Sequence, residues 1–291
     1  MTYLDALSDA ARARAAATLQ IPTPNTIERK PSMSRFVGPF TRRNYGRGHG
    51  YRDARGERVP GVTTILSDGL PKPALVNWAV RTAAEYAVDN WTTLGDLPIS
   101  ERLGMIAGAP NERKQSAALR GTKLHDAAQV LIETGAVDVE PEQVPLVENY
   151  AAFLREWSVV PHYVESAVYS VTHGYAGTLD LIATLADGCV WLLDIKTSKG
   201  VWGDQALQLA AYRHAEFLSD DDVDGADIAM PAVEKVGIVH VRADNYDLVP
   251  MVAGAAEFRA FLYVAQVAAT AKRLRELVGA PLTPERVQVS A

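Results

Sequence analysis

Cysteine is almost absent from this chain, because Cys189 is the single one among 291 residues. One thiol excludes an internal disulfide, an iron–sulfur cluster held by cysteines and a zinc site built on cysteine ligands. Disulfides are rare where the cell keeps thiols reduced, so this composition is typical of a cytoplasmic protein.

Long apolar runs are missing as well. No stretch reaches the roughly 18 apolar residues that a membrane-spanning helix needs. The opening residues, MTYLDALSDA, lack the basic and then apolar layout of a secretory signal. Hydrophobic residues still make up 48% of the chain and charged residues 22%, which is typical of a folded globular protein. We therefore expect a cytoplasmic protein that makes no contact with a membrane.

Positive charge is scarce overall, since the net charge is −6, but it is unevenly distributed. Residues 28–58 hold nine basic and three acidic side chains, a local charge of +6, and the rest of the chain therefore carries −12. The aromatic rings of Phe40, Tyr45, His49 and Tyr51 lie between the basic residues. This mixture is typical of a segment that contacts phosphates and stacks on bases. A solvated, flexible basic loop is the alternative interpretation.

The periodicity of apolar residues predicts an α/β fold. We expect helices over 3–19, 74–91, 100–108, 112–134, 141–157, 203–218 and 255–278. We expect strands over 163–170, 177–185 and 189–196, a strand or turn over 59–66, an acidic surface loop over 220–224, and a hairpin of 236–241 with 246–249. Residues 1–35 are then an N-terminal helix with a flexible linker, and residues 36–291 form a single domain, in which 36–58 is the basic segment.

Two carboxylates and a lysine are predicted to meet on neighbouring strands. Side chains alternate along a strand, so Asp194 and Lys196 share one face at the end of an apolar strand. A three-residue loop that ends in Gly188 sets Asp180 opposite Asp194. Facing carboxylates repel each other, and a divalent cation removes that repulsion. Oxygen ligands favour Mg²⁺ or Mn²⁺; the alternative interpretation is a structural Asp–Lys pair.

Three further features point to the same site. His125 follows Gly121 by four residues in a predicted helix, where the imidazole can complete a metal shell. Gln208 and Tyr212 are hydrogen-bonding residues four apart in an otherwise apolar helix. Glu165 precedes Asp180 on the neighbouring strand, as a further ligand or a base. Each feature alone also fits a structural role: a surface histidine, a half-exposed helical pair and an edge-strand charge.

At these residues the sequence resembles the PD-(D/E)XK nuclease superfamily, in its RecB-like branch of phage-type exonucleases. That branch has a G-x-x-x-H helix, a G-x-[LIV]-D strand, a D-x-K strand and a Q-x-x-x-Y helix in this order. Here they read Gly121–His125, Gly177–Asp180, Asp194–Lys196 and Gln208–Tyr212, within the motif core 115–218. Residues 59–79 look like the N-terminal part of such exonucleases. The resemblance implies a restriction-endonuclease-like core, a central mixed sheet flanked by helices, with helical N-terminal decoration.

The resemblance also implies roles for individual residues. His125, Asp180, Asp194 and the backbone carbonyl of Ile195 would bind Mg²⁺, for which Mn²⁺ would substitute. Lys196 would orient or deprotonate the attacking water, while Gln208 and Tyr212 would support the site or the DNA backbone. Several relatives hold an iron–sulfur cluster through four cysteines, which this chain lacks. The predicted DNA-binding side chains are Arg42, Arg43, Arg47, Arg52, Arg120, Lys123 and Lys199.

The function implied by this resemblance is a Mg²⁺-dependent DNA exonuclease, which hydrolyses phosphodiester bonds in phage recombination or DNA end processing. DNA is the expected partner, with a single-strand annealing protein as a second partner by resemblance only. A phage-encoded enzyme would work in the cytoplasm of the bacterial host. Two alternatives stay open: a structure-specific DNA endonuclease, and a non-catalytic DNA-binding adaptor that keeps the nuclease fold.

Overall fold

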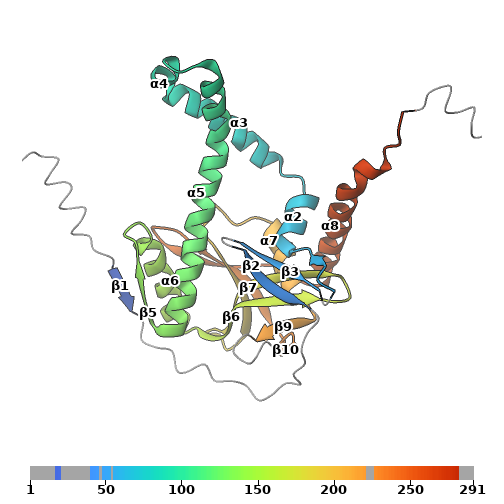
Figure 1. The fold of residues 1–291 in the computed structure, drawn as a ribbon. Coiled ribbons are helices and arrows are strands. Elements are labelled where there is room, and N and C mark those ends of the chain that lie inside the picture. The colour runs from blue at the N-terminus through green and yellow to red at the C-terminus, as the bar shows by residue number, and fades with distance from the viewer. Residues whose placement is uncertain (1–16, 21–39, 46–47, 54, 221–225, 282–291) are drawn as a thin grey trace, which may run out of the picture.

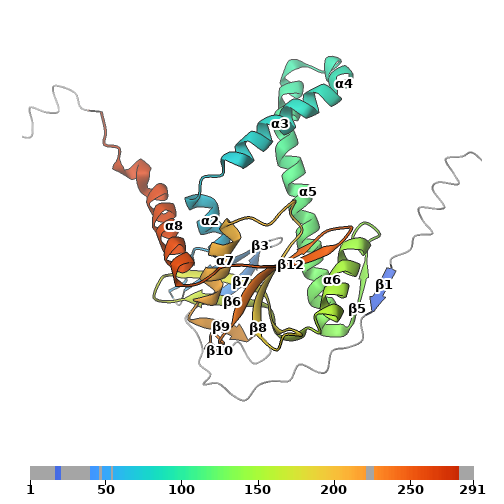
Figure 2. The same cartoon turned by 180° about the vertical axis from the view of Figure 1, so that it is seen from behind.

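The central element of the fold is a seven-stranded mixed sheet that lies between two groups of helices (Figure 1, Figure 2). A computed structural model describes residues 17–20, 40–45, 48–53, 55–220 and 226–281. The strand order is β10-β9-β6-β7-β8-β11-β12, and neighbours run antiparallel except β8 and β11, which are parallel. The predicted α/β class, a mixed sheet flanked by helices, is confirmed.

The helices and strands have the following bounds in the described part of the chain. The seven strands of the large sheet are β6 (Val160–Ser170), β7 (Tyr175–Thr184), β8 (Val190–Lys196), β9 (Phe217–Asp220), β10 (Ala226–Ala229), β11 (Lys235–Val241) and β12 (Tyr246–Pro250). Two small sheets pair β1 (Ala17–Gln20) with β5 (Ala136–Val139), and β2 (Thr41–Tyr45) with β3 (Gly48–Arg52) and β4 (Arg58–Val59). The helices are α2 (Val62–Gly69), α3 (Pro73–Asp89), α4 (Trp91–Gly95), α5 (Ile99–Thr134), α6 (Val144–Glu156), α7 (Asp204–Arg213), α8 (Ala255–Arg273) and the 3₁₀ turn η1 (Leu274–Leu277).

Helices cover both faces of the large sheet, which explains the continuous apolar runs of β7 and β8. On one face Leu181 and Leu193 pack in a cluster with residues of α5 and α6. On the other face Ile182 and Leu192 pack in a cluster with residues of α2, α7 and α8. Strands that are buried on both sides lack the polar alternation of half-exposed strands. Carboxylates in these strands are therefore placed inside the protein rather than at its surface.

The β7–β8 hairpin has the predicted register. Leu181 pairs with Leu193, and the Leu185 amide donates to the Cys189 carbonyl at 3.2 Å. Gly188 has a φ of 75°, the left-handed conformation that a three-residue loop needs and that glycine adopts without strain. The next pair in this register after Leu181 and Leu193 is Asp180 and Asp194, so the two carboxylates lie opposite each other.

Two predicted elements near the N-terminus are corrected by the structure. Residues 3–16 of the predicted helix 3–19 lie outside the described residues. From Ala17 the chain forms the strand β1 instead, and Leu19 of this strand packs against the core. Residues 21–35, the predicted linker, also lie outside the described residues. The predicted strand or turn over 59–66 is helical from Val62, because Val62, Ile65 and Leu66 bury one helical face. This segment is rich in β-branched residues, which favour a strand: Val62, Thr63, Thr64 and Ile65.

Two predicted helix boundaries are also wrong. The two helices expected over 100–108 and 112–134 are one 36-residue helix, α5, which contains Pro110. The helix expected over 203–218 ends at Arg213, because Phe217 and Leu218 pair instead with Tyr169 and Val168 of β6. The acidic loop lies outside the described residues from 221 to 224. The hairpin of β11 and β12 and the closing helix α8 are confirmed.

An arm of α3, α4 and the first half of α5 projects away from the sheet (Figure 1). Among the residues of α3 only Thr82 is fully buried, and the rest of this helix is half-buried or exposed. The second half of α5 returns to the sheet and packs Leu124, Ala128 and Leu131 into the core. None of the described helices combines the length and the apolar character that a bilayer crossing demands.

Candidate metal centre

The side chains singled out by the four motifs line one cavity of about 2160 Å³. Its walls come from β3, α2, α5, α7, α8 and the three central strands β6, β7 and β8. The tertiary structure thus brings together residues that are up to 87 positions apart in the chain. The predicted catalytic and metal-binding side chains that line it are His125, Glu165, Asp180, Asp194, Lys196, Gln208 and Tyr212.

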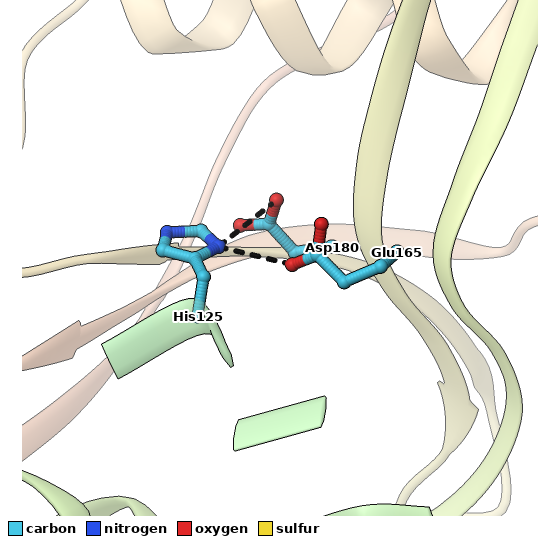
Figure 3. A group of neighbouring side chains, drawn as sticks. All are labelled: His125, Glu165 and Asp180. Carbon is cyan, nitrogen blue, oxygen red and sulfur yellow. Dashed lines mark hydrogen bonds and ion pairs between the residues drawn. The ribbon is translucent and has the colours of Figure 1, made fainter. Parts of the chain in front are cut away.

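His125, Glu165 and Asp180 form a group that could hold a metal ion, since one ligand atom of each lies within 4.8 Å of the others (Figure 3). The Nδ1 atom of His125 lies 3.1 Å from Oε1 of Glu165 and 3.5 Å from Oδ1 of Asp180. The Nε2 atom lies 3.1 Å from the Ile195 carbonyl oxygen and can donate to it. A hydrogen bond of this kind orients a metal-binding imidazole and directs its other nitrogen at the cation. The prediction that the Ile195 carbonyl is itself a ligand stays a prediction.

Glu165 reaches this group through an unusual backbone conformation. Its φ is 48°, inside β6 and between two residues that pair regularly with β7. A left-handed conformation is uncommon for any residue except glycine and is found where the surrounding structure enforces it, often at functional sites. No pattern in the sequence predicts this strain. The sequence leaves the role of Glu165 open, as a further ligand or a base, and the structure places it beside His125.

Asp180 and Asp194 have different surroundings although they are opposite in register. Asp180 accepts a hydrogen bond of 2.6 Å from the Ile195 amide through Oδ2, while Oδ1 faces His125. Asp194 accepts a hydrogen bond of 2.8 Å from Gln208 Nε2 and forms an ion pair with Lys196. Asp194 is not one of the three residues of the His125, Glu165 and Asp180 group, and its predicted role as a ligand stays a prediction.

Gln208 and Tyr212 share one face of α7, as predicted, and this face is buried. Gln208 Nε2 also lies 3.3 Å from the Tyr212 hydroxyl, so one amide group links Tyr212 to Asp194. The ring of Tyr212 lies directly against Gly177, where an added Cβ would be 2.4 Å from Cε1. A glycine in the G-x-[LIV]-D strand thus makes room for the tyrosine of the Q-x-x-x-Y helix.

Replacing Gly177 by alanine is expected to destabilise the protein by about 1–3 kcal/mol, the usual cost of forcing extra atoms into a packed core. The matched control is Gly121→Ala, because a Cβ at Gly121 meets only Thr197 Oγ1 at an ordinary 3.6 Å. Gly121 lies inside α5, where alanine is favoured over glycine by up to about 1 kcal/mol. Urea unfolding of both variants measures the two changes, which should have opposite signs. Equal stability of the two variants would contradict this packing.

Opposite charges raise the pKa values of both basic groups in the centre. The charge of Asp180, assisted by the hydrogen bond to Glu165, raises the pKa of His125 to about 9 against the effect of burial. Burial lowers the pKa of Lys196, but the negative charges of Asp194 and Asp180 outweigh the effect of burial. The pKa of Lys196 is therefore raised. Burial raises the pKa of Asp194 to about 6, although Lys196 opposes the shift. Burial likewise raises the pKa of Asp180 against the charges of His125 and Lys196.

The charge count of the centre favours a divalent cation. With His125 and Lys196 protonated, the centre holds two positive groups and three carboxylates, and its net charge is −1. The three carboxylates are those of Glu165, Asp180 and Asp194. Replacing the proton on His125 by a divalent cation makes the centre neutral. The donor set, one imidazole nitrogen and carboxylate oxygens, fits Mg²⁺ or Mn²⁺ better than a thiolate-seeking metal.

The metal-free protein is expected to lose stability between pH 6.5 and pH 9. A histidine whose pKa is raised on folding contributes stability below its ordinary pKa of 6.5, and this contribution disappears as the pH rises through 9. The loss should be on the order of 3 kcal/mol, measured by urea unfolding in EDTA. A His125→Gln variant should lack this loss of stability with rising pH.

The affinity for Mn²⁺ should rise between pH 6.5 and pH 9, because the metal requires the unprotonated imidazole. An affinity for Mn²⁺ that does not change with pH would argue against His125 as a ligand.

The predicted DNA-binding residues are only partly supported by their positions. Arg52 and Lys123 line the cavity, although Arg52 Nη1 donates to the Gly56 carbonyl and Lys123 is ion-paired with Glu140. Arg120 and Lys199 are exposed. The backbones of Arg42 and Arg43 form part of β2, whereas their side chains and all of Arg47 lie outside what the structure describes.

Two aromatic residues of the basic segment have structural roles, which corrects the base-stacking interpretation for them. Tyr51 is buried, and its hydroxyl lies 2.7 Å from Thr178 Oγ1, one residue after Gly177. Phe40 packs edge-on against Tyr169, with ring centroids 5.1 Å apart. Both rings join the cluster that attaches this segment to β6 and β7. Rings that are needed for packing are not available to stack on bases.

Comparisons with known proteins add little to this description. No model of a protein family matches the chain, and no curated protein matches it. Among solved structures the chain is similar to the protein SSO0001, with 15% identity, over 57% of this chain and 73% of that chain, at a TM-score of 0.28. A similarity at this level supports no conclusion about the site.

Proposed function

We propose that this protein is a metal-dependent nuclease of the PD-(D/E)XK superfamily, and that it acts on DNA as an exonuclease. The observation that carries the proposal is the convergence of His125, Glu165 and Asp180 within 4.8 Å in the cavity that the Asp194–Lys196 pair also lines. A metal group beside a buried ammonium is suited to phosphodiester hydrolysis, in which a water attacks phosphorus while negative charge develops on oxygen.

The metal of this centre would be Mg²⁺, with Mn²⁺ as a substitute, held by His125, Glu165 and Asp180. A bound divalent cation would supply an activated water and would stabilise charge on the phosphoryl oxygens. Asp180 and Glu165 contact His125 through Nδ1, and the Ile195 carbonyl orients it through Nε2. These contacts hold the imidazole in place, and a preorganised ligand lowers the entropic cost of assembling the site.

Lys196 acts in this proposal as a hydrogen-bond donor and positive charge rather than as a base. Its raised pKa keeps the ammonium protonated near neutral pH, so it can orient the attacking water and stabilise the developing negative charge. Asp194 holds the ammonium in place, and Gln208 holds Asp194. The lysine is thus anchored by a chain of polar contacts that ends at Tyr212.

The size of the cavity favours a polymeric substrate over a small one. A volume of about 2160 Å³ exceeds the roughly 300–1,000 Å³ of ordinary small-molecule sites. Helix α5 and helix α8 both contribute to its walls, through residues such as Gln115 and Thr122 of α5 and Gln266 and Lys272 of α8. A single nucleic-acid strand could lie between them, with its phosphates facing the metal centre.

One assay tests the activity, its metal and its mode of cleavage. The full chain is incubated with end-labelled linear single- and double-stranded DNA and with a covalently closed circle, in Mg²⁺, in Mn²⁺ and in EDTA. We expect linear DNA to be degraded from an end in either metal, the circle to remain intact, and EDTA to stop the reaction. Cleavage of the circle would identify an endonuclease instead. Metal-dependent DNA binding without cleavage would identify an adaptor.

A further inference from the structure

His240 is a buried histidine of β11, only 6% exposed, and both of its ring nitrogens have partners. The Nε2 atom lies 2.7 Å from the Ser198 carbonyl oxygen, and the Nδ1 atom lies 3.0 Å from Nη1 of Arg242. A carbonyl oxygen can only accept a hydrogen bond, and a guanidinium group can only donate one. The proton of the neutral imidazole is therefore on Nε2, which donates to Ser198, while Nδ1 accepts from Arg242.

Arg242 is itself held by contacts with two other elements. Its Nη1 atom donates to Oδ2 of Asp247 on β12 at 2.6 Å, and its Nε atom lies 3.5 Å from Oδ1 of Asp244. Its carbonyl oxygen accepts a hydrogen bond of 2.8 Å from Nδ2 of Asn149 on α6. A chain of polar contacts thus fixes the His240 ring and the direction of its Nε2–H bond.

His240 lies beside Lys196, since the two residues are partners in the parallel pairing of β8 with β11. Side chains two or four positions apart on a strand point to the same face of the sheet. Ile238, two residues before His240, and Leu192, four residues before Lys196, both pack in the cluster that contains residues of α7. His240 and Lys196 therefore point to the same face of the sheet, the face that α7 covers.

The hydrogen bond from His240 holds the chain just beyond the lysine. Strand β8 ends at Lys196, so the pairing between strands does not hold the residues that follow. The carbonyl oxygen of Ser198, two residues further on, accepts from the side chain of His240 instead. Lys196 is thus fixed by the strand on one side and by a side-chain hydrogen bond on the other.

Residues 197–203 form the loop that joins β8 to α7, and this loop also touches α5. Thr197 Oγ1 lies 3.6 Å from the position that a Cβ of Gly121 would take, four residues before His125. At the other end of the loop begins α7, the helix that carries Gln208. A shift of this loop would therefore disturb three elements of the candidate metal centre together.

We propose that His240 is a positioning residue for Lys196: by holding the Ser198 carbonyl oxygen it fixes the loop after β8 and so the direction in which the ammonium group points into the cavity. This inference rests on the proposed function, in which Lys196 orients the attacking water. His240 is absent from the described residues that line the cavity. It therefore touches no substrate and acts through the loop.

The test compares two amide side chains that differ in reach. His240→Gln keeps a donor near the position of Nε2, whereas the shorter side chain of His240→Asn can accept from Arg242 but cannot reach Ser198. The matched control is His162→Asn on β6, because His162 Nε2 makes a hydrogen bond of the same length, 2.7 Å, to Thr184 Oγ1, and neither residue lines the cavity. Circular dichroism establishes that the three variants are folded.

We expect His240→Asn to reduce kcat for linear DNA in Mg²⁺ by about 10- to 100-fold, because misplacing a reacting group by about 1 Å can cost about 100-fold. His240→Gln should recover most of this loss, and His162→Asn should cleave at the wild-type rate. The KM for DNA and the affinity for Mn²⁺ should not change, since the loss concerns the transition state alone.

Trypsin provides a second measurement that needs no nuclease activity. Lys199 is exposed and lies in the loop, next to the anchored Ser198. Cleavage after Lys199 should be faster in His240→Asn than in the wild-type protein, in His240→Gln and in His162→Asn, because a loop without its anchor opens more often.

Four results would overturn the inference while leaving the proposed function intact. These are an unchanged kcat in His240→Asn, an equal loss of kcat in His240→Asn and His240→Gln, a change in KM alone, and equal rates of trypsin cleavage in all four proteins. A wild-type protein that cleaves no DNA in Mg²⁺ or Mn²⁺ would overturn the proposed function and the role of His240 in it, so the two failures are distinguishable.

Discussion

Replacing Lys196 by methionine is expected to reduce the rate of DNA cleavage at least about 10³-fold, as the loss of a donor to developing negative charge does in other enzymes. Methionine keeps the length of the side chain but removes the ammonium group. The initial rate of release of labelled nucleotides from linear DNA in Mg²⁺ measures the loss. The affinity for Mn²⁺ should change little, because Lys196 is outside the group of three ligand atoms.

The matched control for this variant is Lys235→Met. Lys235 lies at the start of β11, is ion-paired with Asp187 at 2.8 Å and lies 5.4 Å from the ring centroid of Trp191. It makes a Lys–Asp pair on the same sheet but outside the cavity, so its loss should leave the cleavage rate unchanged. A Lys196→Met protein that keeps a tenth or more of the wild-type rate would exclude the proposed role of this lysine.

The Lys196→Met protein should still fold. Removal of the ammonium group leaves Asp194 buried without its positive partner, which would be costly for a charged carboxylate. The pKa of Asp194 is already raised to about 6 by burial, so the carboxyl group can take up a proton and keep its hydrogen bond to Gln208. Circular dichroism and a melting curve in EDTA establish that lost cleavage does not reflect unfolding.

Replacing Asp180 by asparagine is expected to weaken Mn²⁺ binding by about 100-fold or more, the upper end of the losses measured for supporting residues of metal sites. The substitution removes a negative charge from the ligand group but keeps an oxygen atom that can accept from the Ile195 amide. Calorimetry with Mn²⁺ measures the affinity, and the cleavage rate should fall with it.

The same variant should fold normally without metal. Burial raises the pKa of Asp180, which means that the buried charge is unfavourable in the fold, whereas its attraction to His125 is favourable. Because the substitution removes both effects, we expect the melting temperature in EDTA to change by only a few degrees. An exposed control, Asp187→Asn, should bind Mn²⁺ as tightly as the wild-type protein does. Unchanged affinity in Asp180→Asn would show that the cation binds elsewhere.

The features that sequence patterns predicted correctly are those decided by local chemistry. The glycine at position 188 sets the β7–β8 loop, and the loop sets the register that brings Asp180 opposite Asp194. The spacing of four between Gln208 and Tyr212 is sufficient to place both on one helical face. Helix α5 ends at Thr134, as predicted, because Gly135 follows it in the left-handed conformation with a φ of 76°.

The features that were mispredicted depend on contacts between distant segments. Two helices were predicted over 100–108 and 112–134, but α5 continues through Pro110 between them. Tyr51 was interpreted as a base-stacking residue because its neighbours are basic, yet the tertiary fold buries it against Thr178 of β7.

The amino-acid sequence by itself determined the central strands β7 and β8, the register of their hairpin and the four motifs, since turns, strand alternation and helical spacing act over a few residues. Only the tertiary structure decided which residues belong to the group that could hold a metal ion. It brought Glu165 to His125 through a left-handed residue in β6 and left Asp194 with Lys196. Those choices depend on the packing of α5 and α6 against the sheet, because a strained backbone and a buried charge persist only where many distant contacts outweigh their cost.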